Sequence, residues 1–418
     1  ELINKGLIMA GHDISAGGLI TTLLEMCFSN MEGGMEINLN KIKENDIIKI
    51  LFAENPGIVI QVKDKDKAEV KKILEDAGIG YVKLGTPTDE RHILVTKEDA
   101  TYQFGIDYLR DVWYSTSYLL DRKQSMNGCA KKRFENYKEQ PLEFVFDKSF
   151  TGKFSQYGIT PERRTPTGIK AAIIREKGTN GEREMAYMLY LAGFDVKDVT
   201  MTDLISGRET LEDINMIVFC GGFSNSDVLG SAKGWAGAFL FNPKAKAALD
   251  NFYARKDTLS LGVCNGCQLM IELGLINPEH NKKAKMLHND SHKFESKFVG
   301  VTVPMNRSVM LGSLSGSKLG IWVAHGEGKF SLPYEEDKYN VVLKYSYDEY
   351  PGNPNGSDYS VAGLASSDGR HLAMMPHLER SCFPWQNAYY PSDRINKDQV
   401  TPWIEAFVNA RKWVEMNK

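Results

Sequence analysis

The sequence has no uninterrupted apolar run of about 18 residues, which is close to the length that a helix needs to cross a bilayer. It also has no signal-like first stretch, so we expect no membrane segment. Internal repeats and low-complexity segments are absent as well. Cysteine is scarce, with six residues in 418, and this scarcity favours a reducing compartment over a disulfide-stabilised secreted protein. The sequence therefore predicts a cytoplasmic location.

A large charge excess of either sign is absent as well. The net charge is −3, so electrostatics give no reason to expect nucleic acid or an acidic membrane surface as a partner. Hydrophobic residues make up 42% of the 418, enough for two or three domains with cores of their own. The sequence opens at Glu1 rather than at a methionine, and its first residues look like the end of a helix in a packed domain. We therefore expect a fragment of a longer polypeptide.

Residues 1–150 predict an α+β domain in which strand patterns and amphipathic helices alternate. A glycine-containing stretch, residues 11–18, precedes the first amphipathic helix. Asp13 and Ser15 lie just before that helix, where a carboxylate can bind Mg²⁺ and a hydroxyl can bind a phosphate oxygen. A plain helix cap followed by a glycine turn explains the same residues, and spacing alone favours that simpler interpretation.

A charged, turn-rich linker at residues 151–168 leads to residues 169–418, which predict an α/β domain. Buried-strand patterns alternate there with helix patterns, which implies right-handed crossovers and a largely parallel sheet with helices on both faces. Ligand sites of such sheets lie at the carboxyl ends of the strands, where Gly222 and Cys264 both fall. Each of these two strand ends can contribute a backbone N–H to one oxyanion hole.

The stretch Leu259–Met270 has the form of a nucleophile elbow. A strand-type apolar run ends at Cys264, which stands between Gly262 and Gly266, and a helix-type pattern begins directly after it. A strained turn of this kind needs small flanking residues, which the two glycines supply. The helix N-terminus behind the turn favours a thiolate and a developing oxyanion. We predict that Cys264 is a nucleophile.

A base for this nucleophile is found further along the sequence. One residue separates His377 from Glu379, so on an extended backbone both side chains point to the same face and the carboxylate can orient the imidazole. Cys264, His377 and Glu379 would then form the triad of acyl transfer. A surface pair at a strand end is the simpler interpretation of His377 and Glu379 taken alone.

The spacing of Cys264 and Cys267 also suits a redox pair or half of a zinc site. A zinc site needs two further ligands at suitable spacing, and the scattered His280, His288 and His292 form no second pair. On an elbow helix, Cys267 would instead be a small, half-buried residue. The elbow interpretation is favoured, and the redox and zinc interpretations stay open.

Several motifs resemble those of known enzymes. Four of them are similar to motifs of class I glutamine amidotransferases: Gly221–Ser224, Gly262–Gln268, Val323–Gly328 and Met375–Arg380. Two others, Arg175–Ala186 and Val228–Trp235, resemble the large, single-chain phosphoribosylformylglycinamidine synthase family of purine biosynthesis. The first domain agrees, because residues 12–19 are similar to the second synthetase-like domain of that family and residues 150–152 to its approach to the glutaminase. The resemblance spans nearly the whole chain.

The resemblance implies an enzyme that hydrolyses glutamine at Cys264, with His377 as the base and Glu379 as its orienting carboxylate. The ammonia would pass to a synthetase site, where ATP and Mg²⁺ serve the conversion of formylglycinamide ribonucleotide to the amidine. That site would lie mostly in upstream synthetase domains of the same polypeptide. This chain then looks like the C-terminal part of such an enzyme, beginning inside an aminoimidazole ribonucleotide synthetase-like domain.

The resemblance also implies binding residues for glutamine. The N–H groups of Phe223, or Gly222, and of Asn265 would form the oxyanion hole. Gln268 and His325 would lie near the glutamine. These assignments rest on the motifs alone.

In the family, the residues that match Asp13 and Ser15 contact magnesium and ATP. Ala16 stands where the family usually has aspartate, which weakens the metal assignment. Leu378 stands where proline is usual, which affects only the backbone stiffness between the two triad residues beside it. We therefore expect the triad to survive this second departure.

Two rival functions remain open. A stand-alone cysteine hydrolase of the same fold would act on a γ-glutamyl or peptide bond without an ATP-using partner, but it would not need the first 150 residues. A regulatory or scaffold module with an inactive glutaminase is disfavoured because all three triad members are present. Release of glutamate or ammonia from glutamine, γ-glutamyl peptides and casein would separate the three functions.

Overall fold

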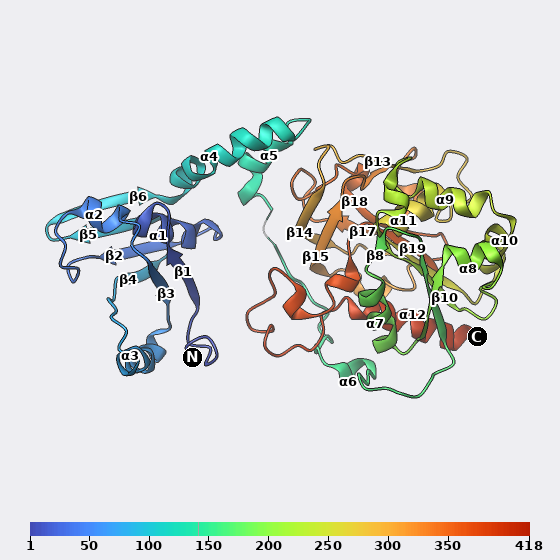
Figure 1. The fold of residues 1–418 in the computed structure, drawn as a ribbon, viewed down its shortest axis with the longest axis horizontal. Coiled ribbons are helices and arrows are strands. Elements are labelled where there is room, and N and C mark those ends of the chain that lie inside the picture. The colour runs from blue at the N-terminus through green and yellow to red at the C-terminus, as the bar shows by residue number, and fades with distance from the viewer. Residues whose placement is uncertain (141) are drawn as a thin grey trace. The chain divides into compact units, whose positions relative to one another are not determined.

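The computed structural model describes residues 1–140 and 142–418, which form two compact units (Figure 1). The first unit spans residues 1–121 and the second spans residues 122–418. No helix within the described residues is both long and apolar enough to cross a membrane.

The two units divide earlier in the sequence than the boundary expected near residue 150. The expected linker, residues 151–168, lies inside the second unit, and so do the residues that precede it from 122 onward. Phe150, Tyr157 and Ile159 are buried in the main core of that unit. Burial of these side chains removes apolar surface from water, which ties the segment to the second unit rather than leaving it as a free connection.

The first unit is built from two small sheets and the helices beside them. β1 pairs with β3, and a second sheet has the strand order β4-β2-β5-β6. The elements are β1 (Ala10–Ile14), α1 (Gly18–Phe28), β2 (Gly34–Asn38), α2 (Ile47–Phe52), β3 (Gly57–Gln61), α3 (Lys67–Asp76), β4 (Gly85–Thr88), β5 (His92–Lys97), β6 (Ala100–Gly105) and α4 (Ile106–Gln124). The apolar stripe of α1 is buried in one core cluster with apolar residues of β2 and β5, as its helical spacing predicts.

The second unit is larger and alternates strands with helices through most of its length. Its helices are α5 (Cys129–Glu135), α6 (Phe154–Tyr157), α7 (Glu182–Ala192), α8 (Met201–Ser206), α9 (Lys233–Leu240), α10 (Pro243–Ala254), α11 (Asn265–Glu272) and α12 (Ile404–Asn417). Its strands are β7 (Lys170–Arg175), β8 (Thr179–Asn180), β9 (Asp195–Thr200), β10 (Met216–Phe219), β11 (Gly221–Gly222), β12 (Leu259–Val263), β13 (Lys285–Leu287), β14 (Glu295–Thr302), β15 (Lys318–His325), β16 (Lys329–Ser331), β17 (Asn340–Tyr345), β18 (Val361–Ala365) and β19 (His371–Met374).

One sheet organises the second unit. Its order is β15-β14-β17-β18-β19-β12-β10-β7-β9, and the half from β19 to β9 is parallel, whereas the other half is antiparallel. α7 packs with α12, whereas α10 packs with α8 and α9, and α9 packs with α11. Helices thus lie on both sides of the parallel half (Figure 1). The predicted α/β class is confirmed.

The central strands of the parallel half are buried because both of their faces are covered. Every residue of β10 and of β12 is buried. β12 lies between β10 and β19, and the chain leaves its carboxyl end directly into α11. The turn between β12 and α11 therefore follows a strand that is buried at every position.

Candidate active site

Cys264 occupies the turn between β12 and α11 in a strained backbone conformation, with φ 53° and ψ −107°. The turn requires the two glycines that flank it. A Cβ atom on Gly262 would lie 2.5 Å from the carbonyl oxygen of Gly266, and one on Gly266 would overlap the carbonyl oxygen of Phe219. The turn therefore has the geometry of a nucleophile elbow, with a thiol-bearing side chain at its apex.

His377 and Glu379 form a buried pair after β19. Nδ1 of His377 lies 2.7 Å from Oε1 of Glu379, and both side chains are 2% exposed. The backbone is not extended here, since Leu378–Arg380 is a short 3-10 turn. The contact between His377 and Glu379 therefore arises from this turn. It does not arise from the alternation of side chains along an extended strand, as the sequence had suggested. The N–H of His377 donates to the carbonyl oxygen of Trp322 at 2.8 Å, which anchors the turn.

Cys264 and His377 meet beside Gly221. A Cβ atom on this glycine would lie 2.9 Å from Cε1 of His377 and 3.3 Å from Cβ of Cys264. Burial alone would lower the pKa of His377, but the Glu379 carboxylate and the Cys264 side chain outweigh it and raise the pKa to about 9. An imidazolium at neutral pH is what stabilises a neighbouring thiolate.

The two N–H groups expected to form the oxyanion hole differ in whether they already donate a hydrogen bond within the chain. Asn265 is the first residue of α11, where an N–H has no partner within the helix. The N–H of Phe223 instead donates to the carbonyl oxygen of Gly178 at 2.8 Å. Gly222 has φ 112°, and a Cβ atom there would lie 2.6 Å from the same oxygen. The Phe223 donor is therefore occupied by the chain itself.

The residues expected near glutamine lie around the elbow. Gln268 is 4% exposed, accepts from Nδ2 of Asn265 at 2.9 Å and donates to the carbonyl oxygen of Glu327 at 2.8 Å. His325 is also buried, and burial lowers its pKa to about 3, so that its ring is neutral. The carbonyl of the preceding residue, Ala324, accepts a 3.4 Å contact from Sγ of Cys264.

Asp13 and Ser15 lie in the first unit. Asp13 is in β1, and its side chain is 71% exposed and 3.5 Å from Nδ1 of His12. The N–H of Gly17, at the start of α1, is taken by the Glu54 carboxylate at 2.9 Å, where a phosphate oxygen would need that donor. Within the described residues no three His, Cys, Asp or Glu side chains could hold a metal ion together. The described residues therefore do not make a complete Mg²⁺ site by themselves.

The sequence did not reveal the roles of three residues at the site, Gly221, Ala324 and Asn289. Gly221 leaves room for the meeting of thiol and imidazole; it belongs to the Gly221–Ser224 motif, but that motif gave it no role of its own. Ala324 acts through its backbone, which carries no sequence signal. Asn289 is 0% exposed and binds the segment that follows Ala324. No pattern in the sequence around Asn289 distinguishes a buried asparagine from an asparagine on the surface.

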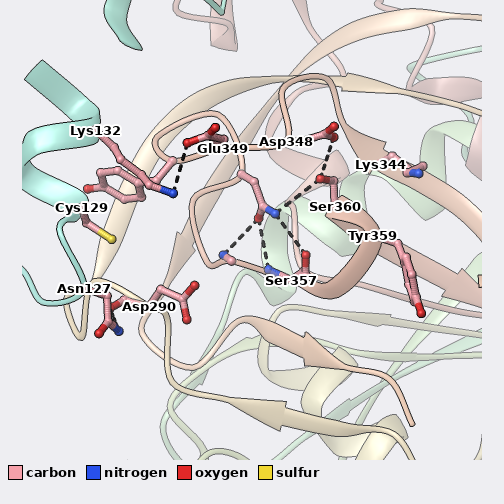
Figure 2. A pocket seen from close by; sticks show the side chains of 13 residues that line it. Asn127, Cys129, Lys132, Asp290, Lys344, Asp348, Glu349, Ser357, Tyr359 and Ser360 are labelled. Carbon is pink, nitrogen blue, oxygen red and sulfur yellow. Dashed lines mark hydrogen bonds and ion pairs between the residues drawn. The ribbon is translucent and has the colours of Figure 1, made fainter. Parts of the chain in front are cut away.

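The second unit also contains a cavity of about 440 Å³ between α5 and the loop before β18 (Figure 2). Figure 2 shows that its wall carries charges of both signs. These charges are already paired or hydrogen-bonded: Lys132 with Glu349 at 3.1 Å, Lys344 with Glu336 at 3.1 Å, Asp290 with Lys329 at 2.7 Å, and Asp348 with Ser360 at 2.9 Å.

Two family models match different parts of the chain. Residues 168–414 match the model of the CobB/CobQ-like glutamine amidotransferase domain. The chain belongs to this glutamine amidotransferase family. Residues 1–97 match the C-terminal domain of AIR synthase related proteins.

Curated relatives carry both parts. The human phosphoribosylformylglycinamidine synthase is 39% identical over 444 residues, which cover 99% of this chain and 32% of that protein. A probable chloroplastic or mitochondrial phosphoribosylformylglycinamidine synthase of Arabidopsis thaliana is 38% identical over 440 residues, covering 99% of this chain and 30% of that protein. The chain thus spans about a third of the length of these relatives, and the resemblance seen in the motifs is confirmed.

A solved structure of PurLQS from Thermotoga maritima is also similar. It is 28% identical, covers 59% of this chain and 99% of its own, and has a TM-score of 0.46.

Proposed function

We propose that the second unit hydrolyses glutamine at Cys264 and that the ammonia is used to convert formylglycinamide ribonucleotide to formylglycinamidine ribonucleotide in purine biosynthesis. The observation that carries the first half is the meeting of a strained elbow cysteine with a buried His377–Glu379 pair. The phosphoribosylformylglycinamidine synthases among the relatives support the second half. The whole enzyme would then be a carbon–nitrogen ligase.

The first chemical step would form a thioester. The Cys264 thiolate adds to the carboxamide carbon of glutamine, and the carbonyl electron pair moves onto the oxygen. The imidazolium of His377 gives its proton to the nitrogen, the C–N bond breaks and ammonia leaves. Glu379 keeps Nδ1 of the imidazole protonated, so that Nε2 is the atom that transfers the proton.

The second step would return the enzyme to its starting state. Water adds to the thioester, and neutral His377 accepts one of its protons. The C–S bond then breaks, the Cys264 thiolate leaves, and glutamate is released after its new carboxyl group ionises. The thiolate and the imidazolium stand ready for another glutamine.

The charge of the oxyanion needs two donors, of which the N–H of Asn265 is one. For Phe223 to be the other, its N–H must exchange the carbonyl of Gly178 for the substrate oxygen. The alternative second donor is Gly222. Either route keeps the oxyanion hole between β11 and the start of α11.

The ligase half would depend on groups outside this chain. ATP would supply the activating phosphoryl group, with Mg²⁺ to neutralise it. Asp13 and Ser15 stay candidate contacts for magnesium and ATP that need the upstream synthetase domains to complete the site. A cytoplasmic location, predicted from the scarcity of cysteine, stays a prediction.

Competition between glutamine and a glutamine-like diazo-ketone tests the proposal. The reagent should alkylate Cys264, and glutamine should protect this residue, whereas γ-glutamyl peptides and casein should not. Protection by a peptide substrate but not by glutamine would favour the stand-alone cysteine hydrolase. Absence of labelling at Cys264 would contradict a glutaminase of any kind.

A further inference from the structure

One buried side chain, that of Asn289, holds the turn His325–Gly328 that follows β15. The backbone N–H of Asn289 donates to the carbonyl oxygen of Gly326 at 2.9 Å. Its Nδ2 donates to the carbonyl oxygen of His325 at 2.7 Å, and its Oδ1 accepts from the N–H of Gly328 at 2.9 Å. Since Asn289 is fully buried, loss of any of these bonds would leave a desolvated backbone group without a partner.

The same carboxamide also sets the ring of His325. Nδ2 of Asn289 faces two carbonyl oxygens, those of His325 and Lys293, so the remaining atom, Oδ1, must be the acceptor. Oδ1 lies 3.2 Å from Nδ1 of His325, which must therefore carry the ring hydrogen. Nε2 of His325 keeps a lone pair, is buried, and has no hydrogen-bond partner within the described residues.

Two residues of the elbow contact this turn or the residue directly before it. Before it, the carbonyl oxygen of Ala324 contacts Sγ of Cys264 at 3.4 Å. Within it, the carbonyl oxygen of Glu327 accepts from Nε2 of Gln268 at 2.8 Å. A shift of this turn would therefore move two carbonyl oxygens together: that of Ala324 beside the sulfur of Cys264, and that of Glu327 beside Gln268.

We propose that Asn289 is a positioning residue for glutamine binding at this site: it fixes the His325–Gly328 turn and keeps His325 as the Nδ1–H tautomer, with Nε2 free to accept a hydrogen bond from the bound substrate. The hydrogen bonds of the Asn289 side chain go to Lys293, His325 and Gly328, and none of these residues belongs to the triad. The inference rests on the proposed glutaminase function.

The chain offers a matched control in Asn353. It is 4% exposed, and its side chain likewise holds a turn, accepting from the N–H groups of Gly356 and Ser357 at 3.1 and 3.2 Å and donating to the carbonyl oxygen of Ser357 at 3.1 Å. This turn borders the cavity of Figure 2. Loss of Asn353 should cost stability in the same way, without moving the turn beside Cys264.

Labelling kinetics of the full 418-residue chain test the proposal. Cys264 is alkylated with a glutamine-like diazo-ketone over a concentration series and, separately, with iodoacetamide, which does not resemble glutamine. For Asn289→Ala, we expect the half-saturating diazo-ketone concentration to rise about tenfold or more, because buried backbone groups of the turn lose their partners. The iodoacetamide rate should stay within about threefold of wild type, because the triad is intact. Asn353→Ala should change neither.

Each outcome separates the two proposals. If wild type is not labelled by the diazo-ketone, the glutaminase function fails. If wild type is labelled and Asn289→Ala saturates at the wild-type concentration, only the positioning role fails. Should Asn289→Ala not fold, nitrogen-correlated NMR of His325 in the wild-type chain decides: the Nδ1–H tautomer supports the proposal, and the Nε2–H tautomer overturns it.

Discussion

Nδ1 of His377 lies 2.7 Å from Oε1 of Glu379, with both side chains 2% exposed, and the Cys264 side chain stands on the other side of the imidazole beside Gly221. A buried imidazole without a carboxylate would be neutral. The pKa of His377 is nevertheless raised to about 9 because Glu379 and Cys264 outweigh its burial. The pair therefore decides both the charge and the orientation of the base.

The first prediction concerns Glu379→Gln. Without the carboxylate, burial dominates and the pKa of His377 falls, so the imidazolium that would stabilise the thiolate and protonate the leaving nitrogen of glutamine is lost. Glutamine-dependent turnover of the intact enzyme should fall by about a thousandfold or more, as when the acidic member of a triad is neutralised. A steady-state assay of glutamate release measures this. Turnover within tenfold of wild type would show that Glu379 does not orient the base.

The second prediction follows the same pKa through pH. His377 is raised from 6.5 to about 9, so its charged form stabilises the folded chain fully below about pH 6.5, and this contribution is lost as the pH rises through about 9. The melting temperature of wild type should therefore exceed that of Glu379→Gln by the largest margin near pH 6.5. This difference in melting temperature should shrink as the pH rises toward about 9. A constant difference across the window would contradict a raised pKa.

The third prediction separates the two cysteines of the elbow helix. A glutamine-like chloroketone or diazo-ketone should label Cys264 and spare Cys267, which is fully buried and whose pKa is raised well above its usual value by burial. Peptide mass spectrometry locates the label, and Cys264→Ser is the control. Modification mainly at Cys267 would contradict the elbow assignment.

The fourth prediction tests how tightly the elbow is packed. In Gly266→Ala, the new methyl group would overlap the carbonyl oxygen of Phe219, and the backbone must shift at a cost of about 1–3 kcal/mol in the free energy of unfolding. Gly237→Ala is the matched control, because Gly237 also lies in a helix but has 3.7 Å to its nearest neighbour, the ring of Phe241. The control should be neutral or slightly stabilising. Equal denaturation midpoints for the two variants would argue against a close-packed elbow.

The fifth prediction separates the two half-reactions in the intact enzyme. If the proposed function holds, Cys264→Ala should abolish synthesis with glutamine while leaving synthesis with ammonium, because the proposed synthetase site would need only ammonia. Parallel assays with the two nitrogen sources measure this. Loss of both activities would mean that Cys264 has a structural role or that the two sites are more tightly coupled than proposed.

Local sequence determined the elbow and the alternation of strands and helices. The apolar run before Cys264 and the glycines at 262 and 266 act over a few residues, so their pattern was sufficient to place Cys264 in a tight turn at a strand end. The buried strands of the parallel half carried their apolar residues in uninterrupted runs, which is why the α/β class followed from the sequence.

Only the tertiary structure decided what surrounds the thiol. Cys264 and Ala324 are 60 residues apart in the sequence, and Asn289 and His325 are 36 apart, yet both pairs are in contact. The boundary between the units and the turn after His377 were likewise set by packing and not by local pattern. Buried polar groups must find partners wherever the folded chain provides them, and which partner is near depends on how distant strands meet, information that no short stretch of sequence contains.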